Sequence, residues 1–181
     1  MSPSSSSPLK VAQARRVERF LHRLRWLSAR LGRNVPPIVD IHSLRSLPPG
    51  SFGHSWAQHL DANGLKPLIR GSRRQQLHDG IHTLTSYGTD PIGEAEVQAF
   101  LLGAKFRLAH LLLLRGILWG VNRQRRHQLI SLSPAAVRSR LHAAYRRGRN
   151  SRFDPDTWQP ETLWPQSLAE VQAIFALENR S

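Results

Sequence analysis

The chain of 181 residues contains no cysteine. This absence excludes disulfide bonds, thiolate metal sites and a cysteine nucleophile, so any metal ion would have to be held by imidazole and carboxylate groups. Long hydrophobic runs are lacking as well. The most apolar stretch, Leu108 to Leu114, lies between Arg107 and Arg115 and is far shorter than the ~20 residues of a membrane-spanning helix. The sequence therefore predicts a globular domain.

Acidic residues are scarce, with 12 Asp and Glu against 26 Lys and Arg and a formal net charge of +14. Such an excess indicates an anionic partner: nucleic acid, an anionic membrane surface or a phosphorylated substrate. No nucleic-acid-binding motif is recognisable and the arginines fall on several separate predicted helices. We therefore expect an anionic membrane surface and no nucleic acid.

One stretch departs from this basic composition. Residues 75–104 contain no Lys or Arg but four acidic residues, Asp79, Asp90, Glu94 and Glu96. Nearby positive charge opposes the binding of a cation, so a locally acidic stretch in a basic protein favours a cation site.

Apolar residues recur at helical spacing along most of the chain, and no convincing alternating β pattern is found. We predict an all-α protein, a compact bundle of about six helices with a helical-hairpin metal site. Residues 1–10 are expected to be a disordered tip and residues 11–181 a single helical domain. The N-terminus also has the composition of a transit peptide, but the helical pattern of residues 17–31 runs directly into the rest of the chain.

Capping residues and helix breakers place the predicted helices. In chain order, we expect an amphipathic helix ending at Gly32, a short helix from Phe52 to about Leu60 closed by Asn63-Gly64, one from about Arg74 to Ser86 that Gly88 breaks, one from Ile92 to about Val121 after Asp90-Pro91, one from Ser133-Pro134 to Gly148, and a last one from Ser167 through Leu177. Residues 34–50 carry four prolines and are expected to be a connection.

The predicted helix from Ile92 to Val121 is apolar on nearly all its faces. A helix of this kind is expected at the centre of a bundle. In a second interpretation, compatible with the first, its side chains line a groove for a hydrophobic tail; they include Phe100, Leu101, Leu108, Leu111, Leu112 and Trp119.

The motif His78-Asp79-Gly80-Ile81-His82 places two imidazoles four residues apart, hence one above the other on a helix. Such a pair alone is a weak signal. Glu94 lies as far after Gly88 as His82 lies before it, so an antiparallel packing of the two helices would bring it level with the histidines. Asp79 could bind directly or orient an imidazole. From spacing alone, a site for Zn²⁺, Fe²⁺ or Mn²⁺ and a solvated face of capping and pairing groups both remain open.

The string HDGIH, followed by eleven residues and Glu94, resembles the H-D-x-x-H-x11-E signature of the Coq-four family of ubiquinone biosynthesis proteins. Four further segments resemble that family: Leu47 to Leu65, Tyr87 to Gly103, Ala143 to Arg149 and Trp158 to Val171. The likeness covers roughly residues 20 to 178. One departure is Ser86, where the family usually has glycine.

The resemblance implies a zinc-binding, peripheral membrane protein of prenylated quinone synthesis, with His78, Asp79, His82 and Glu94 as the metal ligands. It implies a lyase reaction, the oxidative decarboxylation of a polyprenyl-hydroxybenzoate at ring carbon C1. The expected partners are this polyprenyl aromatic lipid, other quinone biosynthesis proteins and an anionic membrane. That membrane would be the cytoplasmic face in a bacterium or the matrix side of the mitochondrial inner membrane in a eukaryote.

A second function is compatible with the same residues: a non-catalytic prenyl-lipid-binding scaffold, with a structural metal, that organises the quinone biosynthesis complex. A homodimer is only the default expectation for a helical protein this apolar. The sequence does not identify the quinone or the native metal.

Overall fold

The computed structural model describes residues 34–126 and 132–177, except the side chains of residues 124–126. Eight α-helices lie in these ranges: α2 (Ile41–Arg45), α3 (Phe52–Ala62), α4 (Arg73–Gln76), α5 (His78–Thr85), α6 (Pro91–Ala104), α7 (Leu108–Arg126), α8 (Pro134–Asn150) and α9 (Leu168–Ile174), with a 3₁₀ helix at Pro160–Thr162. No strand occurs in the described part, so the all-α class is confirmed. The predicted disordered tip and the predicted helix before Gly32 lie outside the described residues.

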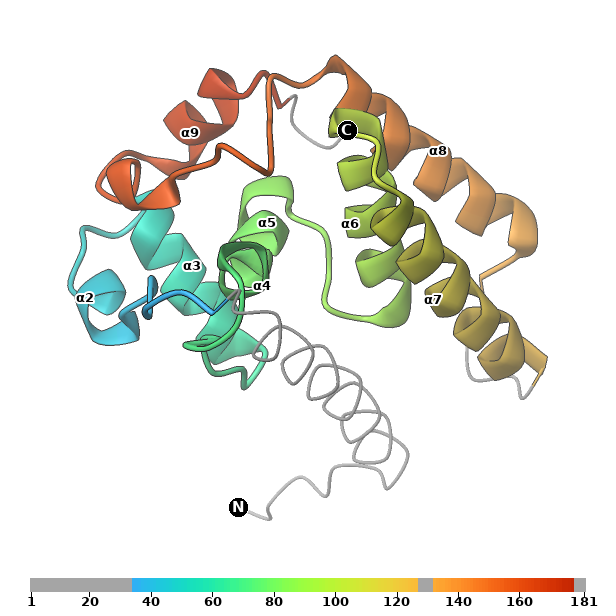
Figure 1. The fold of residues 1–181 in the computed structure, drawn as a ribbon, viewed down its shortest axis with the longest axis horizontal. Coiled ribbons are helices and arrows are strands. Elements are labelled where there is room, and N and C mark those ends of the chain that lie inside the picture. The colour runs from blue at the N-terminus through green and yellow to red at the C-terminus, as the bar shows by residue number, and fades with distance from the viewer. Residues whose placement is uncertain (1–33, 127–131, 178–181) are drawn as a thin grey trace, which may run out of the picture.

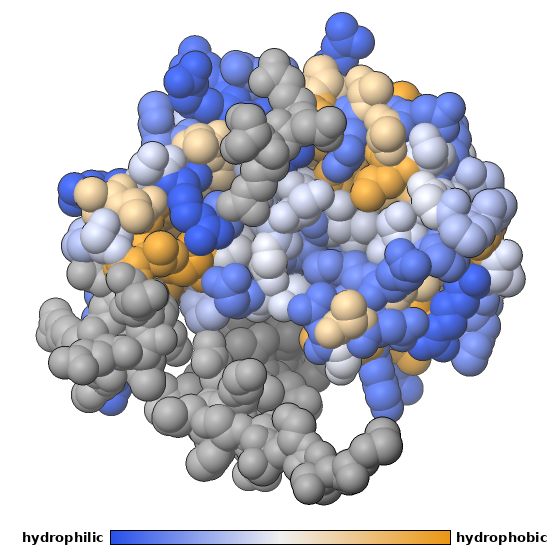
Figure 2. Space-filling model, turned by 180° about the vertical axis from the view of Figure 1, so that it is seen from behind, coloured by the Kyte–Doolittle hydropathy of each residue, from blue (hydrophilic) through white to orange (hydrophobic). Residues whose placement is uncertain are grey.

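The helices form two groups with α5 between them (Figure 1). On one side, α6 packs against both α7 and α8. On the other, α3 packs against α2, α5 and α9. The face shown in Figure 2 is largely hydrophilic, with its hydrophobic residues in separate patches, as expected for a chain with a mean hydropathy of −0.40.

Helices α6 and α8 approach closely because each carries a glycine at the contact. A Cβ atom at Gly103 would lie 2.1 Å from the carbonyl oxygen of Tyr145, and one at Gly148 would lie 2.0 Å from that of Phe100. Real side chains do not approach a backbone so closely. Glycine at both positions therefore determines how near these two helices come.

An aromatic cluster holds α5 against α3. Trp56 of α3 is fully buried and stacks on Trp158 with ring centroids 6.3 Å apart. A Cβ atom at Gly80 would lie only 2.5 Å from the Trp56 ring. Gly80 lies between the two motif histidines, so this contact presses the middle of α5 onto the core and turns the histidines toward α6.

The helix expected from Arg74 to Ser86 is interrupted at Leu77, which separates α4 from α5. Its predicted end at about Ser86 is confirmed to within one residue, since α5 ends at Thr85, but the left-handed Ser86, with φ of 59°, ends the helix before Gly88 is reached. Gly88 instead packs against α6, since a Cβ atom at Gly93 would lie 2.0 Å from the Gly88 carbonyl oxygen. Glycine adopts this left-handed conformation more readily than serine does.

The single helix expected from Ile92 to Val121 was also wrong, because α6 ends at Ala104 and α7 begins at Leu108. Lys105 is extended, with φ of −155° and ψ of 111°. Its ammonium group bonds Asp154 at 2.7 Å and Asp156 at 2.9 Å, and Arg107 also pairs with Asp156. The chain therefore leaves the helical path where two cations reach the acidic segment after α8. The expected connection 34–50 likewise contains one short helix, α2.

The two halves of that predicted helix have opposite environments. Helix α6 is buried along nearly its whole length, as expected for a central helix. Helix α7 is not, since Leu112 is 60% exposed and Trp119 is 68% exposed. The central position predicted for the whole stretch is therefore correct only for α6.

Candidate metal centre

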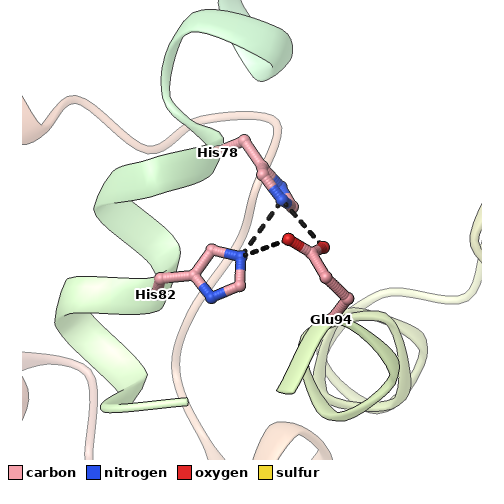
Figure 3. Close-up of side chains that lie close together, drawn as sticks. All are labelled: His78, His82 and Glu94. Atoms are coloured by element: carbon pink, nitrogen blue, oxygen red, sulfur yellow. Dashed lines mark hydrogen bonds and ion pairs between the residues drawn. The ribbon is translucent and has the colours of Figure 1, made fainter. Parts of the chain in front are cut away.

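Two consecutive helices supply the candidate site. His78 and His82 lie one turn apart on the same face of α5, and Glu94 lies in the first turn of α6, where Asp90 caps the helix by accepting from the amides of Ile92 and Gly93. Figure 3 shows α5 from the side and α6 nearly end-on, so the helices cross steeply and do not pack antiparallel as expected. The start of α6 nevertheless brings Glu94 to both histidines.

The three side chains converge on one point (Figure 3). His78 Nε2 lies 3.2 Å from Glu94 Oε2, His82 Nε2 lies 3.3 Å from Glu94 Oε1, and the two Nε2 atoms are 3.2 Å apart. Two ligands each ~2.0 Å from a tetrahedral ion lie roughly 3.3 Å from each other. The spacing of these donor atoms therefore fits a single divalent ion.

The ring of His82 is held in one orientation. It is only 1% exposed, and its Nδ1 atom bonds the carbonyl oxygen of Tyr87 at 3.2 Å. A carbonyl only accepts, so Nδ1 carries a hydrogen, and Nε2 is the ring atom that faces His78 and Glu94, where it could bind a metal ion. The left-handed turn at Ser86 precedes Tyr87 and so contributes to this arrangement.

The protonation states of His78 and Glu94 depend on the contact between these two side chains. Burial lowers the pKa of His78, but the Glu94 carboxylate more than offsets this and raises that pKa to about 9. Burial raises the pKa of Glu94, and the two histidines outweigh it, so the net pKa is well below its ordinary value. Without a metal, His78 and Glu94 thus form an ion pair. A metal ion would replace the proton that they share.

Asp79, the fourth predicted ligand, is not among the donor residues that converge in the described part of the chain. It belongs to the same turn of α5, and burial raises its pKa although His78 and His82 act in the opposite direction. Its role as a ligand, or as a group that orients a ligand, stays a prediction.

The sequence did not point to His59 of α3. Its ring stacks on that of His82 with centroids 5.9 Å apart, and its buried Nε2 atom has no hydrogen-bond partner among the described residues. Burial, and then the charge of His82, lower the pKa of His59. No spacing signal connects these residues, because α3 and α5 are brought together only by the core.

The fold and the site define an all-helical protein with a candidate metal centre of two histidines and a glutamate. No protein-family model matches the chain. It is 29% identical over 158 residues to the ubiquinone biosynthesis protein COQ4 homolog of Xenopus tropicalis, which covers 74% of this chain and 50% of the relative. It is 31% identical over 105 residues to COQ4 of Podospora anserina, covering 45% of this chain and 35% of the relative. Both relatives are named as mitochondrial. The resemblance to the Coq-four family is thus confirmed.

A solved structure shares the fold. It is that of a Nostoc punctiforme protein named as a candidate for ubiquinone biosynthesis, with a TM-score of 0.63, 19% identity, and coverage of 80% of this chain and 71% of that one. This similarity concerns the fold alone. The chain spans about half the length of the Xenopus relative, and its match covers 35% of the Podospora one.

Proposed function

We propose that this protein takes part in the biosynthesis of ubiquinone or a related prenylated quinone through a divalent metal held by His78, His82 and Glu94. The observation that carries the proposal is the convergence of these three donors at ligand spacing. Support comes from the relatives, which are named for ubiquinone biosynthesis. Zn²⁺ is the proposed metal, with Fe²⁺ and Mn²⁺ compatible with the same nitrogen and oxygen donors.

The proposed reaction is the oxidative decarboxylation of a polyprenyl-hydroxybenzoate at C1, in which the carboxylate leaves as carbon dioxide and a hydroxyl takes its place. The metal would supply Lewis-acid stabilisation of negative charge on the substrate. The sequence has no flavin or nicotinamide motif, so dioxygen or an acceptor on a partner protein would take up the two electrons that this exchange releases, and dioxygen or water would supply the hydroxyl oxygen. The chain's own residues hold the metal, and Tyr87 and His59 fix the orientation of His82.

Metal binding is tested first. Elemental analysis and titration calorimetry of the purified protein should show one divalent ion per chain, and His82→Ala should lose it. His142→Ala removes an exposed histidine of α8 and should bind as the unchanged protein does. Equal binding by the two variants would overturn the proposed ligand set.

Catalysis is tested against the scaffold alternative. With metal and dioxygen, a short-chain prenyl-hydroxybenzoate labelled in its carboxyl group should release labelled carbon dioxide. Under the enzyme proposal, Glu94→Ala leaves a folded protein without turnover. Under the scaffold alternative, the same change lowers stability and partner binding together, and the unchanged protein releases no carbon dioxide.

We also propose that α7 places the protein on an anionic membrane surface. The exposed face of α7 carries Leu108, Leu112 and Trp119, and α7 has several arginines but no Asp or Glu. Each basic residue near an anionic bilayer contributes about 1 kcal/mol to binding. Among the described helices, none has the length and apolar character needed to cross a membrane.

Vesicle sedimentation tests this surface. Leu112→Ser combined with Trp119→Ser should abolish binding to phosphatidylglycerol vesicles, whereas Ile174→Ser, at an exposed apolar position of α9, should leave it unchanged. If the double variant instead binds vesicles normally but changes from dimer to monomer in sedimentation velocity, the face is a contact with a second copy.

A further inference from the structure

A buried histidine of α7 holds an arginine of α4 in place. His110 of α7 is buried. Its Nε2 atom lies 2.8 Å from Arg74 Nη2, and its Nδ1 atom lies 2.8 Å from Gln98 Oε1. Three helices, α4, α7 and α6, are thus joined by one hydrogen-bonded network of Arg74, His110 and Gln98.

The direction of these hydrogen bonds follows from their chemistry. A guanidinium can only donate, so Nε2 of His110 must accept and Nδ1 must carry the hydrogen that it donates to the oxygen of Gln98. Burial, followed by the charges of Arg74 and Arg107 and that of His78, lowers the pKa of His110 to about 4. His110 is therefore a neutral acceptor that orients Arg74.

The two ends of this hydrogen-bonded network, Arg74 and Gln98, each lie four residues in sequence from a candidate metal ligand. Arg74 is four residues before His78, with only the short non-helical step at Leu77 between α4 and α5, and Gln98 is four residues after Glu94 on α6. The charge of His78 also contributes to the lowered pKa of His110. His110 thus links Arg74, on the helix that precedes His78, to α6, the helix that carries Glu94.

The charge of Arg74 is only partly compensated. Its nearest carboxylate, Asp156, lies 3.6 Å away, beyond a normal hydrogen bond, and already bonds Lys105 and Arg107. The Arg74 side chain is 34% exposed. The His78 and Glu94 side chains are also partly exposed, so the guanidinium and the metal donors are each accessible from solvent.

We infer that Arg74, oriented by His110, binds the carboxylate of an aryl carboxylate ligand whose ring lies at the metal centre. The planar fork of arginine pairs with a carboxylate through two parallel hydrogen bonds, a geometry that lysine cannot reproduce. The inference deepens the proposed function and rests on it for the identity of the ligand. It assigns to Arg74 the discrimination between the carboxylated ring and the same ring after its carboxylate is lost.

The test compares two probes that differ in one group, a short-chain 3-prenyl-4-hydroxybenzoate and the corresponding 2-prenylphenol. Dissociation constants are measured by calorimetry for the zinc-loaded and the metal-free full chain. Arg74→Gln should weaken binding of the carboxylate by roughly 10- to 100-fold, the size expected for hydrogen bonds to a charged group, and leave phenol binding unchanged. Arg70→Gln, at an exposed position nearby in the sequence, is the matched control.

Arg74→Lys keeps the positive charge and replaces Arg74→Gln in the test if that variant fails to fold. Its affinity for the carboxylate should lie between those of Arg74→Gln and the unchanged protein. Equal affinity of the carboxylate for the unchanged protein and a folded Arg74 variant would overturn the inference, as would an equal loss for both probes. Failure of the proposed function is distinguishable, because it appears as absent zinc binding in the unchanged protein. The effect of Arg74 is then still read from the metal-free measurement.

Discussion

Helices α6 and α7 follow each other in the chain and are both rich in apolar residues, yet their surroundings are opposite. Side chains of α6 fill the space between α5, α7 and α8, whereas α7 directs leucines and a tryptophan to solvent. An apolar composition indicates that the surface of a helix will be covered by other apolar groups. It does not show whether the same domain or a partner outside it provides the cover.

The largest expected effect comes from comparing two side-chain truncations, one in α6 and one in α7. Phe100→Ala removes a fully buried ring of α6 and should lower the free energy of unfolding by about 3–5 kcal/mol. Leu112→Ala removes a largely exposed side chain of α7 and should change it by less than ~0.5 kcal/mol. Urea unfolding followed by circular dichroism measures both. Equal losses would mean that α7 is covered in solution.

Two histidines extend the contrast to the site. In the metal-free protein, His78 faces Glu94 of α6 and should titrate near pH 9, whereas His110 of α7, buried beside Arg74, should titrate near pH 4. NMR titration of the imidazole signals measures both values. Glu94→Gln removes the carboxylate while the burial remains, so the pKa of His78 should fall below its ordinary 6.5.

The ion pair of His78 and Glu94 makes the stability of the metal-free protein depend on pH. The raised pKa of His78 stabilises the fold below 6.5, and this contribution is lost as the pH rises through about 9. The lowered pKa of Glu94 stabilises the fold above 4.5 and is lost in acid. Thermal unfolding should therefore show the pair's full effect between these two ordinary values. A flat profile from pH 6 to 9 that Glu94→Gln leaves unchanged would contradict the ion pair.

Replacing a glycine by alanine should have opposite effects on stability in α6 and in α7. Gly103→Ala places a Cβ atom 2.1 Å from the Tyr145 carbonyl oxygen and should cost about 1–3 kcal/mol through overpacking. Gly116→Ala in α7 meets no atom within 4 Å and should stabilise that helix by up to ~1 kcal/mol. A melting temperature that rises for both variants would show that the α6–α8 contact is looser than described.

The smallest expected effect concerns the break between the two helices. Lys105→Gln removes the ion pairs with Asp154 and Asp156, whose side chains are partly exposed to solvent, so that each pair is weak. We expect a slight loss of stability at low salt that disappears at 1 M salt. A loss that persists at high salt would mean that Lys105 contributes by packing.

Much of the helix order was predictable because its signals are local. Asp90 before Pro91, Ser133 before Pro134, and the capping box of Ser167 with Glu170 all start helices as expected. These contacts join atoms within one helical turn, so they form wherever the chain lies. The break at Lys105 was not predictable, because its partners follow α8, almost fifty residues later.

For the candidate site, the motif spacing placed His78 and His82 on one helix face and Glu94 at the start of the next helix. Metal binding, the role of Asp79 and the bound quinone precursor stay predictions. His59 and His110 were not found, since each belongs to a helix whose distance from the motif in sequence carries no information about its distance in space.

The sequence by itself therefore determined where most helices begin, which side chains could act as ligands and that the chain would be strongly basic. Only the tertiary structure decided that α6 is buried and α7 exposed, that the two ligand-bearing helices cross steeply, and that His110 bonds Arg74. The physical reason is range: capping bonds and helical spacing act over four residues, whereas burial and the contacts between distant helices depend on how all the helices pack together.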